Sequence, residues 1–227
     1  MLTKRTRAPA MKIESTSGII LRTRRLTETS LIVNWLTPDL GRVATVAKGA
    51  RRLKSAFAGQ LDLFYEASFS FARSRRSDLH TLREVRLLDA HAPLRLDLAW
   101  LEQAAYAAAL IEQTTETETP LAEIHALFAG LLKHLPAQPA RPRTIFAFEM
   151  KLLRALGLQP DLDQTKLSAE LRTLAESLTV TPWAQLSGLR ATAAQARGLE
   201  QFLHGYLIYH LGRIPPHRSH VIHPAKL

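Results

Sequence analysis

Residues 30–49 read SLIVNWLTPDLGRVATVAKG, two apolar runs on either side of a turn signal. In both runs one set of side chains returns at every second position, which is the period of a β-strand. This set is Leu31, Val33 and Trp35 in the first run and Val43, Thr45 and Ala47 in the second. Between the runs, PDLG supplies the proline, aspartate and glycine that a tight turn favours. The stretch therefore predicts two neighbouring strands, over 30–37 and 42–49.

Three further strands are predicted around this pair, over 18–25, 61–71 and 79–89. Five short strands joined by turns, within roughly 78 residues, are typical of a small closed barrel. The commonest five-stranded barrel is the OB-fold, whose strands and loops bind single-stranded nucleic acid. The strand count alone also permits an SH3-like barrel.

From Leu94 onward the apolar spacing becomes helical. Helices are predicted from 94 to about 111, from Thr119-Pro120 to about 135, around 145–156 up to Gly157, weakly over 164–178, briefly after Thr181-Pro182, and over 193–211. The predicted fold class is thus α+β. A flexible basic tail (1–12) precedes a five-stranded OB-fold barrel (13–91), and an all-α domain (92–227) follows.

The net charge of +10 is concentrated in the barrel half of the 227 residues. Residues 1–90 hold 17 Lys and Arg against 8 Asp and Glu, whereas residues 91–227 hold 13 against 12. A basic face on one domain indicates a polyanionic partner, either nucleic acid or an anionic membrane. A generally basic, soluble surface is the alternative. The acids Glu112, Glu116, Glu118 and Glu123 are interpreted as a solvated face.

The densest run of cations is AKGARRLKS at 47–55. Neutralising phosphates requires many cations on one surface with few acids among them. We expect contacts to nucleic-acid phosphates from this run, supported by other cations of the barrel. The predicted residues are Lys48, Arg51, Arg52 and Lys54, with Arg22, Arg24, Arg42 and Arg75 in support. Phe57 and Phe64 are candidates to stack on bases, and Trp35 is expected in the core.

Motifs for catalysis are absent from the sequence. No cysteine is present, which excludes disulfides, thiolate metal sites and cysteine nucleophiles, and no GxxxxGK[ST], GxGxxG or HExxH pattern occurs. We therefore expect no enzyme activity and no cofactor. No run of about 18 apolar residues and no secretory apolar segment is found, so a cytoplasmic protein that spans no membrane is expected.

Two groups of histidines have alternative interpretations. His217, His220 and His223 could hold a metal, but a frayed polar tail is preferred. His204 and His210 lie beside Tyr206 and Tyr209, and a polar seam in a helical core is preferred over acid–base machinery.

The stretch GIILRTRRLTETSLIVNWLTPDLGRVATVAKGARRLKS (18–55) resembles the RecO family of bacterial recombinational-repair proteins. The matching positions are Gly18, Arg22, Glu28, Leu36-Thr37, Gly41 and 47–55. Three later segments, at 94–113, 146–162 and 206–213, are also similar to the family in order and spacing. The family's cysteine-bearing zinc module is missing, and DQTKLSAELRTLAESL (163–178) stands in its place. The turn that usually reads YGE is LTE here, at 26–28.

The resemblance implies an N-terminal OB-fold and a helical C-terminal domain. It implies binding to single- and double-stranded DNA, annealing of complementary strands, and help in loading the RecA recombinase onto DNA coated with single-strand-binding protein, together with RecR. It also implies an association with the nucleoid. Two alternatives stay open. One is a module that docks acidic protein tails, with Phe146, Phe202 and Tyr206 as groove candidates, and the other is an RNA-binding barrel.

Overall fold

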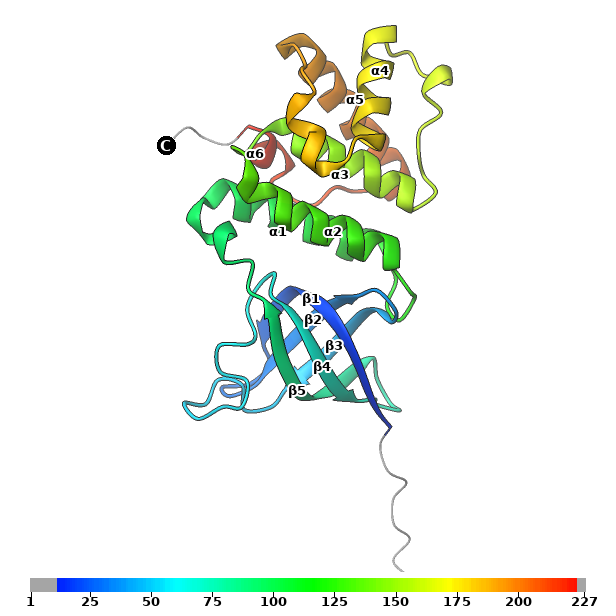
Figure 1. Cartoon of the computed structure of the whole chain (residues 1–227). Coiled ribbons are helices and arrows are strands. Elements are labelled where there is room, and N and C mark those ends of the chain that lie inside the picture. Colours follow the sequence, from blue (N-terminus) through cyan, green and yellow to red (C-terminus); the bar gives the residue numbers. More distant parts are fainter. Residues whose placement is uncertain (1–11, 224–227) are drawn as a thin grey trace, which may run out of the picture.

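Five strands close into a barrel in the N-terminal part of the chain (Figure 1). They are β1 (Ile13–Arg25), β2 (Leu31–Thr37), β3 (Gly41–Ala47), β4 (Glu66–Ala72) and β5 (Leu79–Asp89). The order around the barrel is β1-β2-β3-β5-β4, and β1 also pairs with β4. All pairs are antiparallel except β3 with β5. This is the predicted OB-fold, and the sheet order decides against an SH3-like barrel.

The structure, a computed structural model, describes residues 12–223. The predicted tail over 1–12 therefore lies outside the described residues, except for Lys12. The ammonium of Lys12 lies 3.1 Å from the Glu14 carboxylate.

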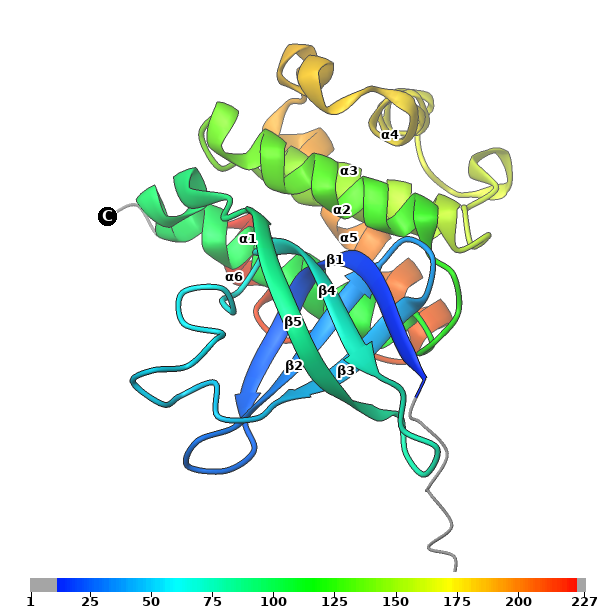
Figure 2. The same ribbon diagram turned by 60° about the horizontal axis from the view of Figure 1, so that its bottom comes forward.

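Helices follow the barrel and form the other half of the molecule (Figure 1). The α-helices are α1 (Leu98–Thr114), α2 (Ala122–His134), α3 (Pro142–Ala155), α4 (Ala169–Val180), α5 (Ala193–Leu211) and α6 (Arg218–Ile222). Short 3-10 helices cover Ala92–Leu96, Leu135–Ala137, Leu162–Gln164 and Trp183–Gly188. Helices α1 and α2 lie against the barrel, and α4 and α5 lie farther from it (Figures 1 and 2).

Two apolar cores hold the molecule together. The barrel interior contains Trp35 stacked on Phe69, with ring centroids 4.1 Å apart, and the Trp35 indole N–H donates to Thr45 Oγ1 over 2.9 Å. The second core fills the helical half and continues onto one side of the barrel through Ile19, Leu21 and Leu36. The barrel and the helices therefore share buried surface, which fixes how they sit against each other.

The segment between α1 and α2, residues 115–121, lies along the barrel and hydrogen bonds to it, and we name it the strap. The Glu118 N–H donates to the Arg42 carbonyl over 3.1 Å, and the Leu121 N–H donates to the Pro38 carbonyl over 3.2 Å. The Glu118 carboxylate also pairs with the Arg73 guanidinium and with His80 Nε2, each at 2.7 Å. Glu118 is exposed, as a solvated face requires, but its carboxylate also joins the segment to barrel residues that are distant in the sequence.

The predicted strand over 61–71 is too long at its start. Phe64 takes a left-handed conformation, with φ 65°, so the chain turns there and β4 begins only at Glu66. The Phe64 side chain is 1 % exposed and packs edge-on against Phe128 of α2. Its expected role as a stacking residue for bases is therefore wrong.

The helix predictions differ from the structure mainly at their starts. Helix α2 begins at Ala122 rather than after Thr119, because residues 115–121 turn along the barrel and hydrogen bond to it through the Glu118 and Leu121 N–H groups. Helix α4 begins at Ala169, with Ser168 as its N-cap, and not near 164. Helix α5 has the predicted bounds, and Gly212 ends it in a left-handed conformation with φ 73°.

The C-terminal histidines do not lie in a frayed segment. Residues 218–222 form α6, and Arg218 is buried in a bidentate ion pair with Glu149 at 2.7 Å for both contacts. The expected polar seam on α5 is also wrong, because His204, His210 and Tyr209 are exposed. Helix α5 instead buries Leu199, Leu203 and Leu207.

Candidate nucleic-acid interface

The predicted cationic run lies in the long loop between β3 and β4, next to the turn between β1 and β2. The Arg51 N–H donates to the Thr29 carbonyl over 3.0 Å, and Arg51 Nη1 donates to the Glu28 carbonyl over 2.8 Å. Strand pairing places both segments at one end of the barrel, since Leu31 pairs with Arg25 and with Ala47. We name residues 24–30 and 48–60 the loop-end surface.

Consecutive tight turns shape this loop. Gly49 has φ +72°, which L-residues with side chains rarely adopt, and the Arg52 N–H then donates to the Gly49 carbonyl over 3.0 Å. The turns continue through Ser55, whose N–H donates to the Arg52 carbonyl. Phe57 is half-buried against the barrel core and anchors the far part of the loop. The chain therefore projects its cations outward while an aromatic ring holds the loop.

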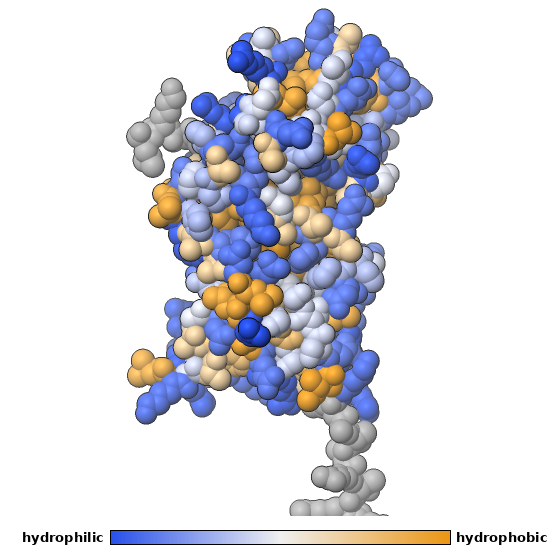
Figure 3. Space-filling model, in the orientation of Figure 1, coloured by the Kyte–Doolittle hydropathy of each residue, from blue (hydrophilic) through white to orange (hydrophobic). Residues whose placement is uncertain are grey.

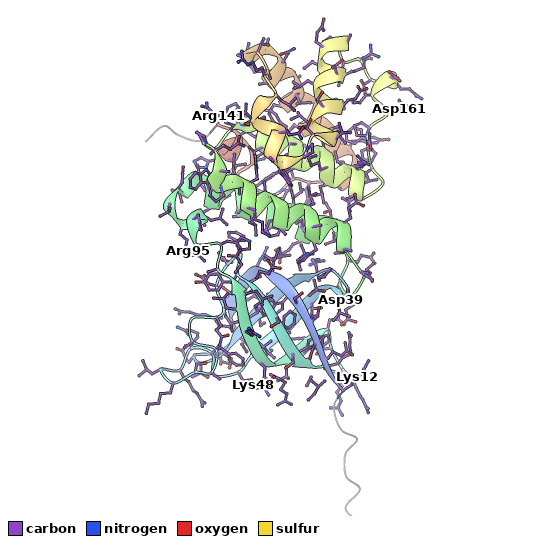
Figure 4. The ribbon with its side chains drawn as sticks, viewed as in Figure 1. Lys12, Asp39, Lys48, Arg95, Arg141 and Asp161 are labelled. Atoms are coloured by element: carbon purple, nitrogen blue, oxygen red, sulfur yellow. The ribbon has the colours of Figure 1, made fainter. Side chains whose placement is uncertain are left out.

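Six cations on the loop-end surface are exposed to solvent, and no ion pair with a carboxylate within residues 12–223 engages them. They are Arg24, Arg25, Lys48, Arg51, Arg52 and Lys54. Glu28 is the single acid in the two segments. Lys48 lies on the barrel away from the helices (Figure 4), and the face of the barrel seen in Figure 3 carries hydrophilic side chains with several hydrophobic patches among them. The structure thus brings together five of the eight predicted contacts: Lys48, Arg51, Arg52, Lys54 and Arg24.

Arg75 lies elsewhere on the barrel. The turn between β4 and β5 holds it, and β4 pairs its last residue, Ala72, with Ile13 at the start of β1. The loop-end surface is at the other end of β1. Arg75 is exposed, but its neighbour Arg73 forms ion pairs with Glu14 and Glu118.

Arg22 and Arg42 meet beneath the helices and not on the loop-end surface. They line a cleft of about 490 Å³ between the barrel and α1. Arg22 pairs with the Glu112 carboxylate, which also accepts from Asn34 Nδ2 over 3.1 Å. Arg42 donates to the Thr115 carbonyl, and burial lowers its pKa while the nearby Glu112 charge opposes that shift. Glu112, expected on a solvated face, therefore lies in this cleft.

A second candidate site, in the helical half, is an apolar cavity of about 320 Å³ with two arginines at its rim. Phe146, Leu178 and Leu199 contribute to its walls, and Arg141 and Arg143 lie at the start of α3. Arg141 is well separated from Lys48 (Figure 4). Of the three groove candidates, Phe146 lines this cavity. The sequence signal for the arginines is the ARPR run at 140–143, where Pro142 opens a helix between two cations.

Within residues 12–223 no group of three or more histidine, aspartate or glutamate side chains is arranged to hold a metal ion. Where the family's zinc module is expected, the described chain forms a short 3-10 helix and α4. Asp163 there pairs with Arg172 at 3.4 Å, and no thiolate is present. The residues of this segment do not fit a structural zinc site, which needs four tetrahedrally placed ligands, usually with cysteine among them.

Among the residues that the structure describes, none of the helices has both the length and the apolar character needed to cross a bilayer.

Comparisons with known proteins match both halves of the chain. A family model described as "Recombination protein O N terminal" matches residues 11–91, and one described as "Recombination protein O C terminal" matches residues 95–168. A protein of Anaeromyxobacter sp. (strain Fw109-5), named DNA repair protein RecO, is 37% identical over 147 residues, which cover 65% of this chain and 57% of that protein.

Two other proteins with the same name are also similar. The one from Roseiflexus sp. (strain RS-1) is 36% identical over 151 residues, covering 66% of this chain and 52% of that protein. The one from Myxococcus xanthus (strain DK1622) is 29% identical over 217 residues, covering 82% of this chain and 87% of that protein. The chain thus spans little more than half the length of the Anaeromyxobacter and Roseiflexus proteins and most of the Myxococcus protein.

Proposed function

Because this chain belongs to the RecO family, we propose that it is a DNA repair mediator that binds single- and double-stranded DNA at the loop-end surface and anneals complementary strands. The observation that carries the proposal is the set of six exposed cations there, which no carboxylate within residues 12–223 engages. A surface of this kind displaces the counterions of a phosphate backbone and holds the strand with little regard to its sequence.

Annealing follows from the same charges. Two phosphate backbones repel each other until cations screen them, and a protein that holds one strand on arginines and lysines lowers this barrier for the second strand. The long side chains of Arg52 and Lys54 are exposed and can reach a second backbone. The proposed role involves binding and annealing without bond cleavage, so oligonucleotides should be recovered intact.

A test is the double charge reversal Arg52→Glu/Lys54→Glu. These two residues make no ion pair within residues 12–223, so the fold should be retained. The matched control is Arg190→Glu/Arg197→Glu, which reverses two exposed cations of the helical half. Fluorescence anisotropy with an oligonucleotide at several salt concentrations should show weaker binding for the loop variant and a log–log salt slope reduced by about 2. Equal loss in both variants, or none in either, contradicts the proposal.

The same fluorescence anisotropy measurement distinguishes a preference for DNA from a preference for RNA. Oligonucleotides of one sequence in both forms should bind with the DNA form preferred, and a clear preference for RNA would favour the RNA-binding alternative. Annealing of complementary strands should proceed in the presence of a chelator, because the residues that replace the zinc module supply no thiolate. Loss of annealing on chelation would contradict a metal-free role.

We also propose that the arginine-rimmed cavity docks the acidic tail of single-strand-binding protein. Its apolar walls and the Arg141 and Arg143 guanidinium groups suit a peptide with an apolar end and carboxylates beside it. Burial lowers the pKa of Arg143, with the Arg141 charge adding to the effect, and Arg143 Nε is buried without a hydrogen-bond partner within residues 12–223. An anionic ligand beside Arg143 would raise the pKa of its guanidinium again and would accept a hydrogen bond from its Nε. The partners RecR and RecA are proposed from the family alone.

Titration with an acidic peptide and with an oligonucleotide tests the separation of these sites. The two ligands should bind together without competition, because the cavity and the loop-end surface lie in different halves (Figure 4). Arg141→Glu should weaken the peptide and leave the oligonucleotide unaffected. Mutual displacement would instead show that the acidic tail occupies the loop-end surface.

A further inference from the structure

The cleft between the barrel and the helices has three walls. The barrel supplies Arg22 and Arg42, α1 supplies Glu112, and the segment after α5 supplies Arg213. That segment lies next to α1, as both ribbon views show (Figures 1 and 2). Its place is fixed because Gln113 Nε2 on α1 donates to the Arg213 carbonyl. The cleft is thus assembled from distant parts of the sequence.

The charges in this cleft do not balance. The Glu112 carboxylate is already engaged by Arg22 and Asn34. Arg42 uses one terminal nitrogen on the Thr115 carbonyl, and its Nε is buried without a hydrogen-bond partner in the described chain. Arg213 is exposed and forms no ion pair within residues 12–223. Three guanidinium groups against one carboxylate favour an anion of about two negative charges or two adjacent phosphodiesters.

The cleft is continuous with the loop-end surface. Arg22 and Arg24 are two positions apart on β1, both exposed, and therefore point to the same side of the strand. Two residues span about 7 Å along a strand. A row of cations thus runs from Arg24 at the end of β1 through Arg22 to Arg42 and Arg213.

We propose that this row is the path of the DNA strand, and that the strand leaves the loop-end surface along β1 and ends in the cleft, where Arg213 and Arg42 bind backbone phosphate. The proposal rests on the proposed DNA binding and extends it to the helical half of the molecule. Arg213 is the new contact. Glu112 limits the affinity, since its carboxylate competes with phosphate for Arg22.

The first test compares a short and a long strand. An oligonucleotide of about eight nucleotides lies within the roughly 4–16 nucleotides that one OB-fold binds, whereas one of about 30 can also reach the cleft. Arg213→Glu should weaken the long strand about 5- to 10-fold at low salt, reduce its salt slope by about 1 and leave the short strand unchanged. The matched control Arg197→Glu, on an exposed part of α5, should change neither.

The second test seeks a gain in affinity. Glu112→Gln keeps the size of the side chain and an oxygen that still accepts from Asn34, but removes the charge that holds Arg22. The long strand should bind about 2- to 5-fold more tightly, with a steeper salt slope. A loss of affinity in this variant, with its unfolding transition unchanged, would overturn the proposal.

The outcomes separate this proposal from the one on which it rests. If Arg52→Glu/Lys54→Glu weakens both strands and Arg213→Glu weakens neither, the path is wrong and the loop-end surface stands. If the wild-type protein binds neither strand, the proposed DNA binding itself fails. If inorganic phosphate or a mononucleotide at low concentration displaces the long strand from the cleft but not from the loop, the cleft is a small-anion site, and the strand path is overturned.

Discussion

The backbone N–H of Arg51 donates to the carbonyl of Thr29 over 3.0 Å, and this bond joins two loops that are 22 positions apart. The Arg51 side chain adds a second link, to the Glu28 carbonyl at 2.8 Å. The Arg51 side chain therefore helps to join the two loops in addition to carrying a charge. The Arg52 side chain carries a charge but makes no such link. The two neighbouring arginines should behave differently on substitution.

Arg51→Ala should loosen the loop-end surface as well as weaken DNA binding. We expect faster hydrogen exchange of backbone amides in residues 48–60, because the link to Glu28 is lost. Arg52→Ala is the matched control, which should weaken DNA binding without faster exchange. Exchange that is unchanged in Arg51→Ala would show that the backbone bond alone orders the loop.

The buried ion pair between Glu149 and Arg218 should be essential for the helical half. Both side chains are almost fully buried, and the Tyr106 hydroxyl also donates to Glu149 over 2.6 Å. Burial and the adjacent carboxylate raise the pKa of Tyr106. Arg218→Met should lower the free energy of unfolding by about 3–5 kcal/mol, because it leaves a buried carboxylate without its partner. Urea unfolding measures this loss.

The double variant Glu149→Met/Arg218→Met provides the control for that experiment. It removes both charges, so most of the stability should return. A double variant as unstable as Arg218→Met would mean that packing around α6, and not the unpaired charge, explains the loss.

Glu14 should make stability depend on acid pH. Its hydrogen bonds with Arg73 lower the pKa of its carboxyl from 4.5 to about 2. Because the folded pKa is below the unfolded one, Glu14 stabilises the protein above about pH 4.5, and this contribution is lost as the pH falls toward 2. Glu14→Gln should cost about 1 kcal/mol at pH 7. The difference from wild type should disappear near pH 2 in chemical unfolding experiments.

Exposed Glu84 on β5 offers the comparison for Glu14. Glu84→Gln removes a carboxylate that makes no ion pair within residues 12–223, so it should leave the free energy of unfolding at pH 7 unchanged. A Glu14→Gln variant that keeps a constant stability difference from pH 7 to pH 2 would contradict the assigned linkage.

Gly41 should not tolerate a side chain where the strap crosses the barrel. Its φ is +68°, and an added Cβ would lie 1.8 Å from the Thr119 carbonyl oxygen. Gly59 has a similar φ of +71° with no atom within 4 Å of such a Cβ. Gly59→Ala should therefore cost only the left-handed strain of about 1–2 kcal/mol, and Gly41→Ala clearly more. Thermal unfolding of the two variants isolates the contribution of the strap, and equal losses would contradict the close contact.

Much of the fold could be predicted because it depends on neighbours in the sequence. The period of two in 30–49 identified β2 and β3 and placed Trp35 in the core, where it is 0 % exposed. Helix α5 had the predicted bounds because Thr192 and Gln195 form a capping box at its start and Gly212 ends it. The turn at Phe64 was missed because a left-handed phenylalanine has no local sequence signal.

The candidate site could be predicted only in part. The run at 47–55 pointed to the loop-end surface, since its cations are adjacent in the chain and have no acid among them. The cleft that joins Arg22 and Arg42 to Arg213 could not be predicted, because it depends on the position of Glu112 and on the turn after α5.

By itself, the sequence determined the strand and helix periods, the concentration of positive charge in the first 90 residues and the absence of thiol chemistry. These are properties of composition and of neighbouring positions. Only the tertiary structure decided which cations are free to meet a phosphate. The physical reason is that charges interact through space over a few ångströms, and the carboxylate that engages Arg22 comes from Glu112, 90 positions away. Folding leaves the cations of AKGARRLKS exposed, whereas in the cleft it pairs Arg22 with Glu112, a carboxylate that competes with phosphate.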